Sequence, residues 1–157
     1  MPNYLIIIGF VVGGVARGIL VGLLVLITAQ LFTNLEVQNI SLSLLIVILT
    51  AILFSLAGMI NAIFAHSFDD ISIVPTFVLT PLIYLGGVFY SIELLSDFWQ
   101  GVSKINPILY MVNSFRYGMI GISDISIDYA ILMICLFILI FSIFVYVLLK
   151  RGIGIRT

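Results

Sequence analysis

The stretch HSFDD holds the densest group of side chains in the sequence that could do chemistry. His66, Asp69 and Asp70 follow the helical spacing i, i+3 and i+4, which places them on one face of a helix. Imidazole and carboxylate groups are ordinary metal ligands, but no second cluster in the sequence completes a coordination shell. The pattern therefore favours two other roles, in which an aspartate caps the following helix or the turn contacts a partner.

Two arginines stand among apolar residues. Arg17 interrupts the first hydrophobic run, and Arg116 lies within NPILYMVNSFRYG, residues 106–118. A charge at the centre of a bilayer costs about 2.5–3.5 kcal/mol on insertion scales, so Arg17 should face protein, water or the interface. We expect the residues before Gly13 to form an interfacial helix. The first span then starts near Arg17, whose side chain can reach lipid phosphates.

Enzymatic chemistry has no support in the residue pattern. The sequence contains no nucleophile–base pair, no paired carboxylates within its apolar runs and no GxxxxGK(S/T) phosphate loop. A net charge of −1 provides no basic patch for nucleic acid. We therefore expect no enzyme activity, no bound cofactor and no nucleic-acid partner.

Composition indicates an integral membrane protein. Of the 157 residues, 63% are hydrophobic and only 8% are charged, whereas soluble domains carry roughly 25% charged residues. Four apolar runs suit helical spans, and they lie at residues 5–32, 41–64, 74–90 and 129–149. The predicted fold class is an all-α membrane protein with four transmembrane helices plus an outer re-entrant or interfacial helical hairpin.

Charge distribution sets the expected orientation. The last span is followed by three basic residues, Lys150, Arg151 and Arg156. The positive-inside rule then places both termini and the turn at residues 65–73 in the cytoplasm, with residues 91–128 outside. Lys104 and Arg116 lie on the expected outer segment, and these two basic residues favour the opposite orientation.

The outer segment contains the hairpin. Asn106 and Pro107 are typical of a helix start, and Gly118 and Gly121 can end that helix. Backbone that breaks at membrane depth survives only where protein or a water-filled cavity satisfies it. We therefore predict a re-entrant or interfacial hairpin over residues 98–121, with an amphipathic helix on the outer surface as the alternative.

Two further features concern helix packing. Gly14, Gly18 and Gly22 recur every four residues and form a stripe that lets a second helix approach closely. That helix belongs either to another subunit or to the same chain. Pro81 removes one backbone hydrogen bond within the third run, so we expect a kink there, either structural or lining a pathway.

The motifs LTPLIYLGGVFYSIELLS and NPILYMVNSFRYG together resemble the signature of ABC-2 type permeases, the membrane subunits of one class of ABC exporter. The positions of that signature are filled by Leu79, Leu82, Leu85, Gly86, Val88, Leu95, Ser96, Pro107, Ile108, Tyr110 and Arg116. The resemblance covers nearly the whole chain. The sequence is similar in particular to a bacterial inner-membrane subgroup of the family, and this similarity implies a multi-pass protein of the inner membrane.

The resemblance implies one permease domain over residues 1–157, containing the last four of the family's usual six spans. It also implies a homodimer among membrane lipids, served by two ABC ATPase subunits that hold ATP and Mg²⁺. The outer hairpin would be fixed by Gly86, Pro107, Tyr110 and Arg116. The cytoplasmic coupling side would carry Arg17, His66, Asp69 and Asp70.

These expectations lead to one main function. The chain is expected to be a membrane-spanning permease subunit of an ATP-driven exporter, which forms the translocation pathway and couples to separate ATPase subunits. The alternative is a truncated, non-transporting membrane protein that binds a full-length permease. An ion-coupled carrier would need an ionisable residue near the middle of a span, and only Arg17 comes close.

Overall fold

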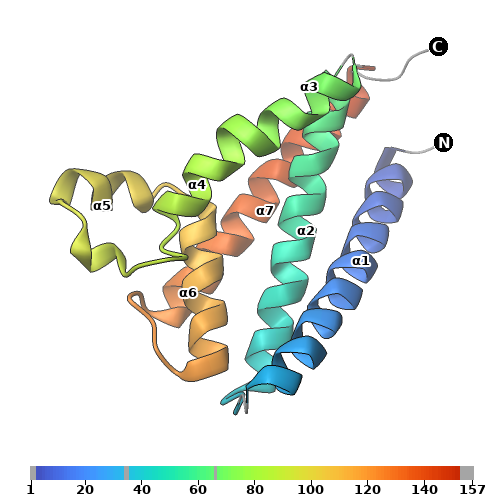
Figure 1. Ribbon diagram of the computed structural model, residues 1–157. Helices are drawn as coiled ribbons and strands as arrows, with labels where there is room; N and C mark the ends of the chain where they lie inside the picture. Colours follow the sequence, from blue (N-terminus) through green and yellow to red (C-terminus); the bar gives the residue numbers. More distant parts are fainter. Residues whose placement is uncertain (1–2, 34–35, 66, 153–157) are drawn as a thin grey trace.

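The computed structural model describes residues 3–33, 36–65 and 67–152. Every regular element in these ranges is helical, and no strand occurs in them, which confirms the predicted all-α class. Three helices in the described ranges are long and apolar enough to cross a membrane. They are α1 (Asn3–Phe32), α2 (Ile40–Phe64) and α7 (Ile127–Lys150). Figure 1 shows them side by side, with the start of α1 and the end of α7 toward the same end of the bundle.

Helix α1 runs without a break for 30 residues. At 1.5 Å per residue it is about 45 Å long, so it exceeds the roughly 30 Å hydrocarbon core of a bilayer. The predicted separate helix before Gly13 is therefore wrong, because Gly13 and Gly14 both lie inside α1. A glycine costs a helix only about 1 kcal/mol relative to alanine, and the apolar residues on either side continue the same helical run.

The core forms where α2, α7 and α6 (Pro107–Ile120) meet. Helix α2 begins at the N-cap Asn39, whose side chain accepts a hydrogen bond from the Leu42 backbone N–H. The central cluster contains side chains from all three helices: Ile46, Leu53, Tyr110, Met111, Ala130 and Ile134. A second cluster between α2 and α7 consists of Leu56, Met59, Val145 and Leu149. Most other apolar side chains of the long helices are exposed, as expected for surfaces that face lipid.

The third predicted span, residues 74–90, is helical only as far as Leu85. It contains the π-helical segment η1 (Val74–Leu79) and α4 (Thr80–Leu85), and a short helix, α3 (Phe68–Ile73), comes directly before it in the predicted turn. Three of the four predicted spans are thus present as helices of spanning length, and this one is not. Pro81 cannot donate a backbone hydrogen bond, and the wide turns of η1 lie directly before it. We call residues 68–85 the bent rod, and Figure 1 shows it leaning away from α1.

The glycine stripe of α1 faces α2 of the same chain. A Cβ on Gly18 would lie 3.0 Å from the Cβ of its neighbour on α2, and one on Gly14 would overlap the side chain opposite. Facing Gly14, Gly18 and Gly22 in that order are Ser55, Ala51 and Val47. Small residues therefore occur on both sides of this contact, and the two backbones approach closely. This face of α1 is covered within the chain.

Substitution of Gly14 tests this contact. We expect Gly14→Leu to lower the free energy of unfolding by about 1–3 kcal/mol, because the added side chain has to displace α2. Gly13→Leu is the matched control, since a Cβ at Gly13 meets nothing within 4 Å. Thermal unfolding in detergent measures both variants. Equal unfolding midpoints for the two variants would contradict close packing at Gly14.

Candidate functional site

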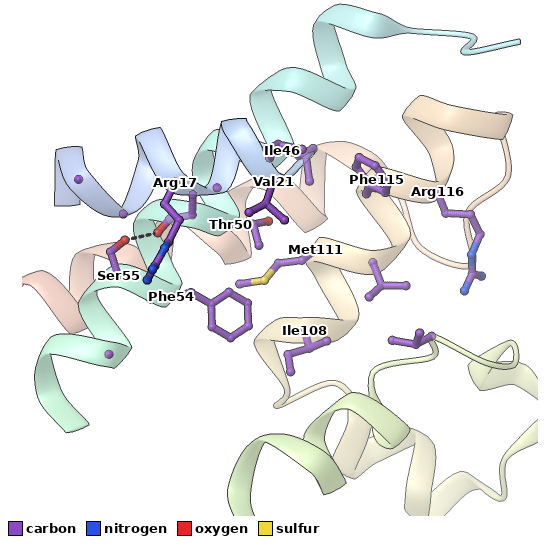
Figure 2. A pocket seen from close by; sticks show the side chains of 18 of the residues that line it. Arg17, Val21, Ile46, Thr50, Phe54, Ser55, Ile108, Met111, Phe115 and Arg116 are labelled. Atoms are coloured by element: carbon purple, nitrogen blue, oxygen red, sulfur yellow. Dashed lines mark hydrogen bonds between the residues drawn. The ribbon is translucent and has the colours of Figure 1, made fainter. Parts of the chain in front are cut away.

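A large groove lies between α1, α2 and α6. Its volume is about 1330 Å³, and its lining is mostly apolar. Arg17 and Arg116 lie at opposite ends, with Phe54 and Met111 between them (Figure 2). The groove is therefore a long apolar surface with a guanidinium group near each end.

Arg17 lies away from the end of the bundle that carries α3. The neighbouring Gly18 faces Ala51, which is near the middle of α2. Asp69 and Asp70 lie beyond the C-terminal end of α2, in the first turn of α3. Arg17 thus lies apart from Asp69 and Asp70, with which it was grouped on the expected cytoplasmic side. The reason is that the glycines of α1 pack against the middle of α2, where Gly18 faces Ala51, and this contact fixes the level of Arg17.

The two aspartates have different local roles. The Ser67 hydroxyl accepts from the Asp70 N–H at 3.2 Å, and the Asp70 carboxylate accepts from the Ser67 N–H at 3.0 Å. This reciprocal pair is a capping box, so Ser67 is the N-cap and Asp70 completes it. Asp69 is exposed in the same turn. His66 lies outside the described residues, and no group of metal ligands is found within them.

Asn106 joins the end of α4 to the start of α6. Its carbonyl oxygen accepts from the Ile108 N–H at 3.0 Å, and its amide donates to the Leu82 carbonyl at 2.6 Å. The Gly86 N–H bonds to Ile83, so it does not pair with the Leu82 carbonyl in the usual helical manner. Because a buried carbonyl without a partner is costly, the Asn106 amide stabilises the point where the bent rod ends.

Gly86, Pro107 and Tyr110 form the contact around this junction. A Cβ on Gly86 would lie 2.7 Å from the Cγ2 of Ile108, so α4 and α6 meet closely there. Pro107 occupies the first turn of α6, where its missing N–H costs nothing. The buried Tyr110 hydroxyl donates to the Lys104 carbonyl at 2.5 Å. A tyrosine hydroxyl is neutral at physiological pH, and burial raises the pKa of Tyr110 further, to about 12.

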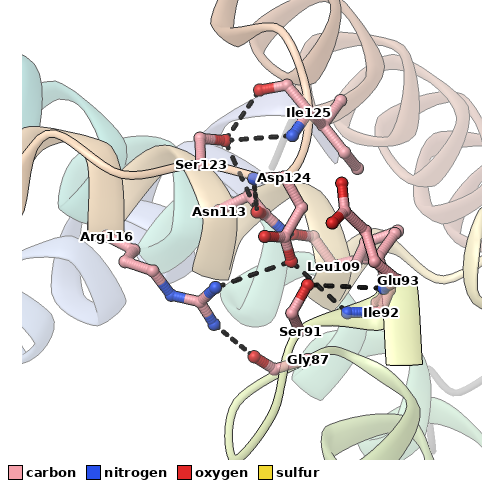
Figure 3. A network of polar contacts seen from close by, with 10 residues as sticks. All are labelled: Gly87, Ser91, Ile92, Glu93, Leu109, Asn113, Arg116, Ser123, Asp124 and Ile125. Atoms are coloured by element: carbon pink, nitrogen blue, oxygen red, sulfur yellow. Dashed lines mark hydrogen bonds and ion pairs between the residues drawn. The ribbon is translucent and has the colours of Figure 1, made fainter. Parts of the chain in front are cut away.

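Arg116 connects three segments beside α6. Its guanidinium donates to the Gly87 carbonyl and lies 3.6 Å from the Asp124 carboxylate. The same carboxylate oxygen accepts from the Ile92 N–H at 3.3 Å. Figure 3 shows the side chain of Arg116 between the loop after α4 and the loop before α7. We call Arg116, Asp124 and their backbone partners at Gly87 and Ile92 the arginine clamp.

Asn113 supports the clamp from inside α6. It is fully buried, and its carbonyl oxygen accepts from the Asp124 N–H at 2.8 Å. Its amide donates to the Leu109 carbonyl at 3.0 Å. Asn113, Asn106 and Asp124 were not among the site residues predicted from sequence. The sequence did show one signal, the amide of Asn113 within the apolar pattern of α6. Its partner Asp124 lies in another segment, so the contact could not be predicted from the pattern.

The hairpin is also attached at its far end. The Asn39 N–H donates to the Gly118 carbonyl at 2.9 Å, which joins the turn between α1 and α2 to α6. A Cβ on Gly118 would lie 2.5 Å from the Ser43 hydroxyl, so this approach requires glycine. Two helices, α5 (Asp97–Ser103) and α6, form within the segment predicted to be a hairpin, and α6 is held at both of its ends.

Comparison with known proteins decides the family. The model of the ABC-2 type transporter family matches residues 1–120. This chain belongs to the ABC-2 type transporter family. It is 50% identical, over all of its 157 residues, to the inner membrane transport permease YadH of Escherichia coli strain K12. Nodulation protein J of Neorhizobium galegae is 29% identical over 108 residues, 68% of this chain and 40% of that protein.

The family membership confirms the predicted transport permease class and the predicted inner-membrane location, since three helices are apolar enough to span. This chain spans 61% of the length of the YadH permeases that it matches. No solved structure matches it.

The arginine clamp can be tested with a double-mutant cycle. We expect Arg116→Ala to lower the free energy of unfolding by about 1–3 kcal/mol, because the Gly87 carbonyl and the Asp124 carboxylate lose a donor. Asp124→Ala should cost a similar amount. The double variant should be less damaged than the sum of the two, because both remove the same contact. Strictly additive losses in thermal unfolding would contradict the ion pair.

Proposed function

We propose that this chain is the membrane-spanning permease part of an ATP-driven ABC exporter, with ATP and Mg²⁺ bound by separate ATPase subunits. The observation that supports it best is the family match over residues 1–120 together with 50% identity to a transport permease along the whole chain. The given sequence carries no GxxxxGK(S/T) phosphate loop, and ATP hydrolysis is proposed to take place in the partner subunits.

The proposed topology has four crossings, with the bent rod as the third. Both ends of the chain and the α2–α3 turn then face the cytoplasm, and the loop before α7 faces outward. The hairpin of α5 and α6 is re-entrant from the outer side. The four crossings correspond to the last four of six in a complete permease, which we propose to act as a homodimer among membrane lipids.

The contacts of the bent rod suggest how ATP binding is coupled to the outer hairpin. Near the cytoplasmic end, the Asn61 amide of α2 donates to the Ile71 carbonyl of α3 at 2.9 Å. At the other end, the rod is held to α6 through the bond from Asn106 to Leu82. No residue of η1 or α4 is buried, so the rod can tilt without breaking a packed core.

A tilt of the rod would move the hairpin through two connections. One is the Asn106 junction, and the other is the arginine clamp, which holds the Gly87 carbonyl just after α4. The ATPase subunits shift the conformational equilibrium only if they contact the cytoplasmic turn differently in the two states. Asp69 is the exposed charge of that turn and is proposed to lie at this contact.

Cysteine labelling tests the topology. In a Cys135→Ala background, a cysteine at Asp128 should react in intact cells with a membrane-impermeant maleimide, because Asp128 is exposed in the first turn of α7. A cysteine at Asp69 should react only after permeabilisation. Asp124 is unsuitable for this purpose, because its carboxylate is held in the arginine clamp. The reverse pattern of labelling would contradict the proposed orientation.

Coupling is tested by ATP turnover. The chain is reconstituted in nanodiscs with an ABC ATPase subunit, and ATP hydrolysis is measured with and without the permease. We expect stimulation that Asp69→Lys reduces roughly tenfold, equivalent to about 1.4 kcal/mol of interaction. Glu93→Lys is the matched control, since Glu93 is an exposed carboxylate outside the cytoplasmic turn. A complete absence of stimulation would favour the alternative of a non-transporting protein that binds a full-length permease.

A further inference from the structure

Two prolines bracket the π-helical segment η1 of the bent rod. Pro75 lies in the first turn of η1, and Pro81 lies in the first turn of α4, directly after it. A proline has no backbone N–H, so the carbonyl four residues before it lacks its α-helical donor, and the proline ring clashes with that carbonyl. The two carbonyls concerned belong to Ile71 and Phe77. The sequence thus removes α-helical hydrogen bonds on both sides of η1.

Side-chain hydrogen bonds follow the wider register of this segment. The Thr80 hydroxyl donates to the Pro75 carbonyl at 3.3 Å, five residues back along the chain. The hydroxyls of Thr28 in α1 and Ser55 in α2 each donate to the carbonyl four residues back, as is usual in an α-helix. Hydrogen bonds that reach back five residues define a π-helix, so Thr80 follows the same register as the η1 backbone.

The π register changes how α4 is oriented relative to α3. The rod is a continuous helix through η1, since Ile73 and Thr80 at its two ends both have right-handed helical backbone angles. A π-helical turn inside an α-helix contains about one extra residue, and such turns frequently occur at functional sites. If η1 took the α register with no residue removed, α4 would turn by about one residue relative to α3. One residue of an α-helix corresponds to a rotation of about 100° and a rise of about 1.5 Å.

The α3 end of the rod has a fixed orientation. The Ile71 carbonyl, which Pro75 leaves without its helical donor, accepts from the Asn61 amide at 2.9 Å. Asn61 belongs to α2, one of the three membrane-length helices of the described chain. A change of register in η1 therefore turns α4 while α3 stays attached to α2.

The carbonyls that hold the outer hairpin lie on the other side of η1. The Leu82 carbonyl accepts from the Asn106 amide, and the Gly87 carbonyl accepts from the Arg116 guanidinium (Figure 3). A rotation of about 100° would turn both carbonyls away from these donors. The π register is therefore the one that directs them at the hairpin, and every contact involved joins residues of this chain.

We propose that η1 is a two-register switch that holds or releases the outer hairpin. In the π register, which the structure shows, the contacts from Asn106 and Arg116 hold the hairpin to the rod. In the α register, α4 is rotated and both contacts are broken. The N–H groups of η1 keep acceptors in both registers, because each moves from the carbonyl five residues back to the carbonyl four residues back. Resting on the proposed function, we infer that the ATPase subunits drive this change through the α2–α3 turn.

Disulfide formation between the end of α4 and α6 reports the register. In a Cys135→Ala background, Gly86→Cys is combined with Ile108→Cys. A Cβ at Gly86 would lie 3.2 Å from the Cβ of Ile108, close to the roughly 3.5–4.5 Å found across a disulfide. Mild oxidation of the 157-residue chain in nanodiscs should therefore cross-link the two cysteines rapidly in the π register.

Variants of η1 then decide whether the register controls this contact. Thr80→Ala together with Pro81→Ala should favour the α register, because the side-chain bond of the π register is lost and the missing N–H is restored. We expect cross-linking to slow about tenfold. Deletion of Val78 in this background removes the extra residue, so α4 regains its orientation and cross-linking should recover. Val78→Ala in the same background is the matched control and should not restore cross-linking.

Deletion of Thr76 should restore cross-linking as well as deletion of Val78 does, since each removes one residue from η1. General damage to the fold would not be repaired by removing a further residue. Unchanged cross-linking in the Thr80→Ala, Pro81→Ala variant would overturn the switch. Failure of both deletions to restore cross-linking would overturn it too.

The role of the switch has a separate readout. A chain that combines the two alanine substitutions with the Val78 deletion is held in the α register with its hairpin attached, so it should lose most of its stimulation of ATP turnover. Full stimulation by this chain, with cross-linking restored, would overturn the coupling role alone. Cross-linking needs no ATPase. Failure of the wild-type chain to stimulate the ATPase would therefore overturn the proposed function and leave the switch standing.

Discussion

The structure depends on one constraint, which is that backbone polar groups away from water must find partners inside the protein. The long helices α1, α2 and α7 satisfy it internally. The break between the bent rod and α6 does not, because a helix ends there and a loop begins. Asn106 supplies the donor for the Leu82 carbonyl, and Arg116 supplies one for the Gly87 carbonyl. These two side chains allow irregular backbone to exist between apolar helices.

The same constraint explains how Asn113, a polar residue of α6, can lie on the buried face of that helix. Asn113 is fully buried, yet it pairs with the backbone at Leu109 and Asp124. A buried polar group that is paired in this way orders its surroundings, whereas an unpaired one costs about 1–3 kcal/mol. The loop before α7 is therefore held by polar side chains as well as by Ile125, which packs against the central cluster. This makes the hairpin, the clamp and α7 one connected unit, while the bent rod stays loosely packed.

Packing in lipid places a second demand on the chain, because apolar area alone does not drive one helix against another there. The glycines of α1 and the small residues of α2 meet this demand by close approach. That contact also fixes Arg17 beside the groove, level with the middle of α2. A residue expected at the membrane interface therefore lies at one end of the apolar groove between α1, α2 and α6. The position of Arg17 is thus set by the register in which α1 packs against α2.

The sequence by itself determined the all-helical membrane class, three of the four expected spans, the helix that begins at Asn106-Pro107 and the family. Each of these depends on composition and on spacing within a few residues, such as the apolar runs and the Asn106-Pro107 helix start. The tertiary structure alone decided that the glycine stripe faces Ser55 and Ala51, that α1 has no break at Gly13, and that the bent rod replaces a regular third helix. It also decided that Arg116 meets Asp124 and that Arg17 lies far from Asp69. These features depend on contacts between segments distant along the chain, because a side chain's partner is set by how the helices pack and not by its neighbours in sequence.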